Sequence, residues 1–82
     1  MTNRHPRRVL EDIADMARRG VGLNGAIAVT GIGGYKTTDG RRFFERWLIR
    51  HGGDDLIAPL KANQQSMESD PRYAVLLGVV QP

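Results

Sequence analysis

Residues 25–40, GAIAVTGIGGYKTTDG, combine clustered glycines with a lysine and two threonines, as phosphate-binding loops do. In a loop of the Walker type, four residues separate the first glycine from a Gly-Lys-Ser/Thr unit. Here Tyr35 stands between the last glycine and Lys36, so the lysine does not follow the glycine whose backbone would cradle the phosphate. The chain also lacks room for the parallel sheet and base pocket of nucleotide hydrolases. We therefore predict neither binding nor hydrolysis of nucleoside triphosphates.

A second glycine pattern, GVGLNG at residues 20–25, matches the Gly-x-Gly-x-x-Gly spacing of dinucleotide-binding folds. That fingerprint follows a strand and opens a helix. This stretch instead follows an expected helix and precedes an expected strand. We interpret it as a connector whose glycines permit turns.

Histidine and aspartate side chains could carry acid–base or metal chemistry. His5 and His51 lie far apart in the sequence, and no carboxylates cluster around either, so we predict no metal site. Asp54 and Asp55 are neighbours on a helix, where they would point about 100° apart, so we interpret the pair as a helix-start signal. We expect no catalytic residues, no cofactor and no enzymatic activity.

A set of arginines is the strongest functional candidate. Three recur at every fourth residue and would form one basic stripe on a helix: Arg42, Arg46 and Arg50. Arg41 and Lys36 are close in sequence. Guanidinium groups make forked contacts with carboxylates and phosphates, so the stripe suits an acidic protein surface, which we favour, or a nucleic acid.

The alternative is that these arginines form an ordinary solvated helix face. Glu45 and acidic residues of the first helix would then neutralise part of the charge. The aromatic neighbours Phe43, Phe44 and Trp47 are assigned to the core rather than to a base-stacking platform, because the chain has few other large side chains from which to build one.

The positive charge is concentrated in the first part of the chain. Residues 1–51 hold ten Lys/Arg against five Asp/Glu, a balance of +5, whereas residues 52–82 hold two against four, a balance of −2. Ten of the twelve basic residues are Arg, a bias that a GC-rich genome would also produce. The basic part is the expected contact surface.

Composition limits the class of protein. The 82 residues predict a single small domain over 1–82, and the lack of cysteine excludes disulfides and thiolate metal sites as its support. No apolar run approaches the roughly 20 residues of a membrane-spanning helix, and charges occupy the N-terminus where a signal peptide is apolar. We expect a soluble cytoplasmic protein.

Two helices stand out in the pattern of apolar residues. The first covers residues 6–19, where apolar residues recur every three or four positions until Gly20. The second covers about 40–51, with Asp39 as its N-cap and Gly52-Gly53 as its stop. Between them, AIAVT and YKTT have β-favouring residues around Gly33-Gly34, so we predict a β-hairpin.

The last third is harder to assign. A third helix is expected in DDLIAPLKANQQSM, with Pro59 near its first turn. The apolar run from Tyr73 to Val80 favours a buried strand, although Asp70 and Pro71 would suit the start of a helix instead.

Together these elements predict a small α+β domain, with about three helices on a short sheet made of the Gly-rich hairpin and the C-terminal strand. A mainly α fold is the alternative. The expected function is stoichiometric, non-enzymatic binding of a macromolecular partner, as in a small regulator or a phage-type inhibitor of host machinery. The alternative is a nucleic-acid-binding module with an Arg-rich helix. A homodimer is a further expectation, because the C-terminal apolar run could form an interface.

Overall fold

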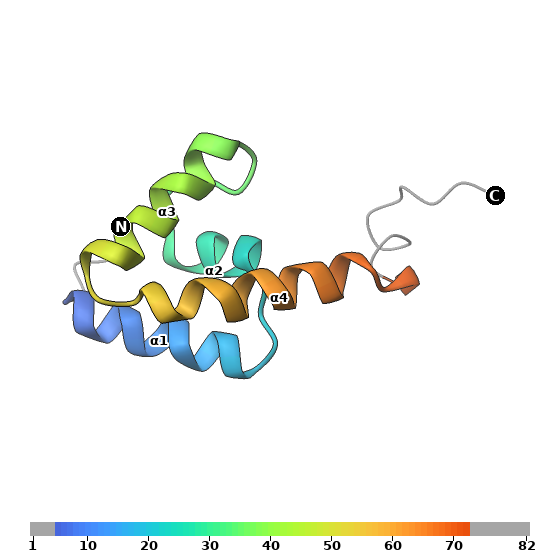
Figure 1. Cartoon of the computed structure of the whole chain (residues 1–82), viewed down its shortest axis with the longest axis horizontal. Coiled ribbons are helices and arrows are strands. Elements are labelled where there is room, and N and C mark those ends of the chain that lie inside the picture. Colours follow the sequence, from blue (N-terminus) through green and yellow to red (C-terminus); the bar gives the residue numbers. More distant parts are fainter. Residues whose placement is uncertain (1–4, 73–82) are drawn as a thin grey trace.

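The computed structural model describes residues 5–72, which fold into helices alone (Figure 1). In chain order these are α1 (Pro6–Arg18), α2 (Leu23–Thr30), α3 (Thr38–Arg50), the short 3-10 helix η1 (Asp54–Leu56) and α4 (Ile57–Glu68). α1 and α4 lie side by side, while α3 rises steeply from them. The α+β prediction is therefore wrong, and its mainly α alternative describes residues 5–72.

The predicted first helix is confirmed as α1. His5 caps it by accepting a hydrogen bond at Nδ1 from the Arg7 backbone N–H, at 3.2 Å, and Pro6 occupies the first turn. Val9 and Ile13 are buried, as the periodic pattern predicts. Gly20 follows the helix with a φ of 87°, a left-handed conformation that glycine adopts without strain.

The predicted hairpin is wrong, because AIAVT belongs to α2. Leu23, Ala26 and Ile27 are spaced at i, i+3 and i+4 and are buried together. At the start of α2, the Asn24 backbone N–H donates to Gln64 Oε1 of α4 at 3.0 Å. An eight-residue helix is marginal by itself, so this tertiary packing overrides the β-propensity of the segment.

A glycine-rich loop, residues 31–37, occupies the place of the predicted turn. Gly31 ends α2 with a φ of 73°. Gly33 has a φ of 76°, and a Cβ there would clash with the carbonyl oxygen of Gly40 in the first turn of α3. A Cβ on Gly40 would in turn lie 2.6 Å from the Cα of Gly34. The glycines therefore let the loop lie directly against α3.

The predicted second helix is confirmed as α3, with two corrections. Its N-cap is Thr37, whose Oγ1 accepts from the Gly40 N–H at 2.9 Å, and Asp39 lies inside the first turn. Phe44 is fully buried, but Phe43 is 57% exposed. The two side chains differ in burial because successive residues on a helix point about 100° apart.

Trp47, which we expected in the core, is only partly buried and packs at the edge of the core cluster. Its ring lies against that of His51, with centroids 4.4 Å apart.

The predicted third helix is confirmed as η1 and α4, with Pro59 in the first turn of α4. Two amide side chains of α4 hold the link between α1 and α2. Asn63 Nδ2 donates to the carbonyl oxygens of Ala17 and Val21, both at 2.9 Å. Gln64 Oε1 accepts from the backbone N–H of Asn24 in α2. The bonds to Val21 and Asn24 pair backbone groups beside the start of α2, where helix geometry supplies no partner, and the Ala17 carbonyl oxygen also accepts from the Gly20 N–H.

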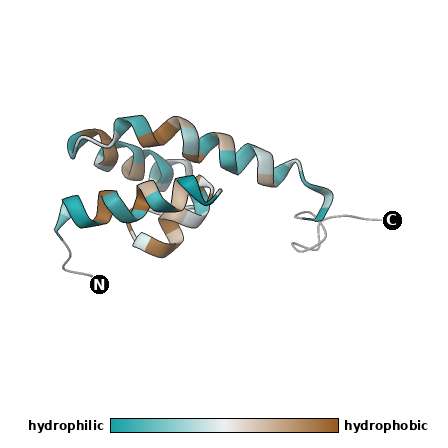
Figure 2. Ribbon diagram, turned by 90° about the horizontal axis from the view of Figure 1, so that it is seen from below, coloured by the Kyte–Doolittle hydropathy of each residue, from teal (hydrophilic) through white to brown (hydrophobic). Residues whose placement is uncertain are grey.

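The core joins all four α-helices. Figure 2 shows hydrophobic residues interspersed among hydrophilic ones along α1 and α4. Eight hydrophobic residues form the buried cluster: Val9, Ile13, Leu23, Ala26, Ile27, Phe44, Leu48 and Leu60.

The segment from Tyr73 to Val80, for which we predicted a strand, lies outside the described residues. Just before it, Asp70 Oδ1 accepts from the Arg72 backbone N–H at 2.8 Å, and the two side chains form an ion pair. Hydrogen bonding to Arg72 lowers the pKa of the Asp70 carboxyl.

Candidate functional site

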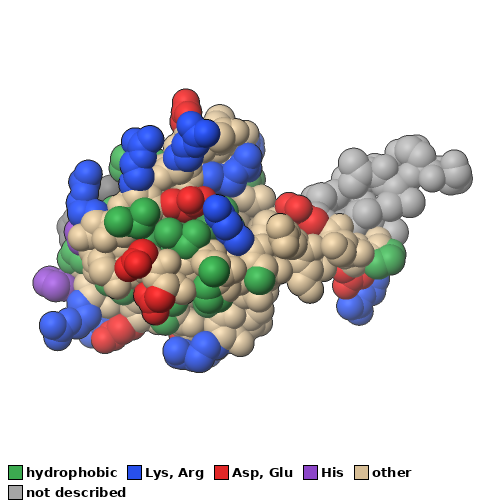
Figure 3. Space-filling view, viewed as in Figure 1, with side chains coloured by type: hydrophobic (Ala, Val, Ile, Leu, Met, Phe, Trp, Pro, Cys, Tyr) green, Lys and Arg blue, Asp and Glu red, His purple; other side chains and the backbone are tan. Residues whose placement is uncertain are grey.

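The exposed side of α3 carries the predicted arginine stripe. Arg42, Arg46 and Arg50 are all exposed, and rises of about 6 Å separate consecutive members along the helix. Figure 3 shows Lys and Arg side chains gathered over α3. We call this side of α3 the outer face and define it by its exposed residues: Asp39, Arg42, Phe43, Arg46, Ile49 and Arg50.

The three arginines have no internal partner within residues 5–72. Salt bridges there involve other side chains. Glu45, which we expected to neutralise part of the stripe, instead pairs with Lys61 of α4, with Nζ and Oε2 3.3 Å apart. Like charges spaced four residues apart repel one another, so the arrangement costs α3 some stability unless an anion is nearby.

Two large apolar side chains border the stripe, and the sequence reasoning missed both as surface residues. Phe43 is 57% exposed and Ile49 is 59% exposed. They lie about 120° apart around the helix, with the arginines between them. Periodicity could have revealed this. Phe43 and Ile49 each follow or precede a buried residue, Leu48 or Phe44, by one position, so they lie about 100° around the helix from it, at the margins of the exposed side.

Arg41 and Lys36, the other predicted contact residues, lie apart from the stripe. Arg41 is partly buried, and its Nη1 donates to the Tyr35 carbonyl oxygen at 2.7 Å, which ties the glycine-rich loop to α3. Lys36 is exposed in that loop, with Nζ 6.0 Å from the centroid of the Tyr35 ring.

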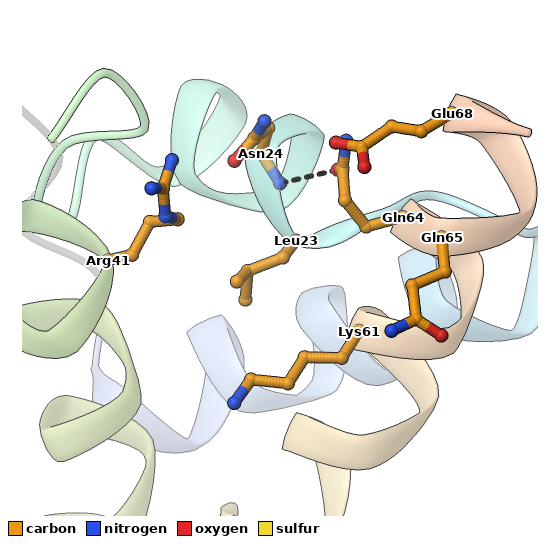
Figure 4. Close-up of a pocket in the computed structure, with 7 residues that line it drawn as sticks. All are labelled: Leu23, Asn24, Arg41, Lys61, Gln64, Gln65 and Glu68. Carbon is orange, nitrogen blue, oxygen red and sulfur yellow. Dashed lines mark hydrogen bonds between the residues drawn. The ribbon is translucent and has the colours of Figure 1, made fainter. Parts of the chain in front are cut away.

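A pocket of about 270 Å³ lies among α2, α3 and α4 (Figure 4). Several of its polar groups already have partners. Gln64 Nε2 donates to Glu68 Oε2 within α4 at 2.8 Å, Gln64 Oε1 accepts from α2, and Lys61 binds Glu45 of α3. Asn24 Oδ1 is buried without a hydrogen-bond partner in the described structure. The pocket is lined by Leu23, Asn24, Arg41, Lys61, Gln64, Gln65 and Glu68.

The remaining candidates lie at helix ends. His5 and His51 are at the start of α1 and the end of α3, and Asp54 and Asp55 are exposed in η1. Among residues 5–72, no group of three or more His, Cys, Asp or Glu side chains is placed to hold a metal ion. No helix of the described part of the chain is both long and apolar enough to cross a membrane.

Comparison of the chain with known protein families, with curated proteins and with solved structures finds no match.

Proposed function

We propose that this is a non-enzymatic binding protein whose α3 outer face contacts an anionic macromolecule. It would act stoichiometrically in the cytoplasm by covering part of its partner, as a small regulator or a phage-type inhibitor of host machinery does. The observation that carries the proposal is the row of three exposed arginines on one helix, which have no partner among residues 5–72.

An ordinary solvated face explains this row less well. Surface arginines gain from nearby carboxylates, and in this protein Arg18, at the end of α1, and Arg19, its C-cap, both pair with Asp15, at 3.3 and 3.0 Å. α3 has two carboxylates: Glu45 binds Lys61 instead, and Asp39, on the outer face itself, forms no ion pair with the three arginines within residues 5–72. The row therefore keeps three forked donors available for a partner, which contributes specificity and faster association.

Retention on a heparin column, a generic polyanion, tests the proposal. The variant R42Q/R46Q/R50Q keeps side-chain length and helix propensity while removing the charges of the outer face. The matched control R18Q/R19Q/R72Q also removes three charges, from exposed ion pairs on α1 and beyond the end of α4, which contribute little to stability.

We expect the outer-face variant to elute at clearly lower salt than the control, since three adjacent contacts are lost only in the former. Circular dichroism must show equal helicity in both. Elution of the two variants at the same salt would mean that heparin binding follows net charge alone, and the outer face would then be a solvated surface.

The expected homodimer stays a separate prediction, checked by sedimentation equilibrium of the full chain.

A further inference from the structure

We infer that the anionic partner is double-stranded DNA and that α3 enters its major groove. The inference rests on the proposed function and names its partner. It is carried by three features of the outer face: its accessibility, the order of side chains across it and the charges around it.

α3 has the shape and accessibility that the groove requires. An α-helix with side chains is about 10–12 Å across, and the major groove is about 12 Å wide. The buried side of α3 contacts α2 and η1, whereas its outer face stays exposed from Asp39 to Arg50. In Figure 1, α3 stands at the edge of the helical body, so a duplex could approach it along its length.

The order of side chains favours DNA over an acidic protein. A helix that binds a groove on a protein places apolar anchors along the middle of its contact face. The outer face is arranged the other way, with Arg42, Arg46 and Arg50 between the apolar margins Phe43 and Ile49. Central arginines can reach guanine N7 and O6 or phosphates, and apolar side chains can contact thymine methyl groups.

The surroundings offer phosphates little repulsion on the side of α2 and the glycine-rich loop, whereas η1, which also packs against α3, exposes Asp54 and Asp55. α2, which packs against α3, has no charged side chain, and Lys36 is exposed in the loop between the two helices. Glu45 is engaged by Lys61. Asp39 is the acidic residue of the outer face itself, so it is the side chain expected to weaken DNA binding.

Binding of the intact protein to a fluorescein-labelled 20-base-pair duplex of mixed sequence tests the inference. Fluorescence anisotropy gives the affinity as a function of salt. Loss of three phosphate contacts in R42Q/R46Q/R50Q should flatten the log–log salt slope by about 2.7, at about 0.9 per contact, whereas R18Q/R19Q/R72Q should leave the slope near that of the parent protein.

A gain of binding provides a check that misfolding cannot imitate. Asp39→Asn removes the negative charge of the outer face, and we expect about two- to fivefold tighter duplex binding at low salt. The control Glu11→Gln, at an exposed position of α1, removes the same charge from a helix other than α3 and should have a smaller effect. Equal effects of the two substitutions would contradict the contact with DNA.

Groove choice is tested by competition. Methyl green occupies the major groove and distamycin the minor groove, so only the former should displace the protein. Displacement by distamycin alone, or no affinity for the duplex, would overturn the inference.

The heparin and duplex experiments together distinguish a failure of this inference from a failure of the proposed function. If heparin retention depends on the outer face but the duplex does not bind, an acidic partner of another kind is indicated; if both are insensitive to the stripe, both proposals fail.

Discussion

At the scale of single residues, two adjacent phenylalanines of α3 have opposite environments. Phe44 is fully buried among the core residues, whereas Phe43 is 57% exposed on the outer face. Phe44→Ala would leave a cavity, and we expect it to lower the free energy of unfolding by about 3–5 kcal/mol. Phe43→Ala should lower it by much less, about 1 kcal/mol at most, since more than half of this side chain is already exposed.

Urea denaturation followed by circular dichroism compares the two variants directly. A domain of this size has limited stability, so a stabilising osmolyte is added to both variants if Phe44→Ala is largely unfolded in buffer. Similar losses for both variants would show that Phe43 is packed against the rest of the protein and is not free to meet a partner.

At the scale of elements, the contact between the glycine-rich loop and α3 sets the position of the outer face. Alanine is a better helix former than glycine by about 1 kcal/mol. Gly40→Ala should nevertheless destabilise the protein by about 1–3 kcal/mol, because the new methyl group would press on the backbone of Gly34.

Gly25→Ala is the matched control, since it also replaces a helical glycine. Its new Cβ would meet a side-chain methyl of Val21 at 2.9 Å, and that side chain can turn away. Thermal unfolding should therefore show a lower Tm for Gly40→Ala and a similar or higher Tm for Gly25→Ala. A higher Tm in both would mean that the loop does not rest on α3.

The elements also show how far the sequence could be interpreted. α1, α3 and α4 were predictable because each has 12 or 13 residues with helical spacing or clear end signals. α2 was not, because its N-terminus is held by Gln64, forty residues further along the chain, and its glycines and β-branched residues favour turns and strands. Tertiary packing decided its structure.

The candidate site was predictable in part for the same reason. Spacing alone placed Arg42, Arg46 and Arg50 on one side of a helix. It could not show that Glu45 is engaged by Lys61, because that contact depends on how α4 packs against α3. The hydrogen bond from Arg41 to the loop likewise depends on a turn whose path the sequence did not reveal.

At the scale of the whole molecule, binding to the outer face should stabilise the folded state. A ligand that binds only the folded protein adds about 1.4 kcal/mol when its free concentration is ten times Kd. For a domain of this size, that corresponds to a rise in Tm of roughly 6–11 °C. We expect the 20-base-pair duplex to produce such a rise at low salt.

Differential scanning fluorimetry across a series of duplex concentrations measures the effect. R42Q/R46Q/R50Q should show little shift with the duplex, while its Tm without DNA should equal or slightly exceed that of the parent protein, because repulsion within the stripe is relieved. A full shift in this variant would locate the DNA contact elsewhere.

The amide side chains of Asn63 and Gln64 also have a consequence for how the protein is made. During synthesis the segments of α1 and α2 leave the ribosome well before α4, yet the Val21 carbonyl and the Asn24 N–H at their junction bind side chains of α4. α2 is too short to persist alone, and Leu60 of α4 completes the buried cluster. The nascent chain should therefore remain unfolded until α4 emerges, and then fold in one late, cooperative step.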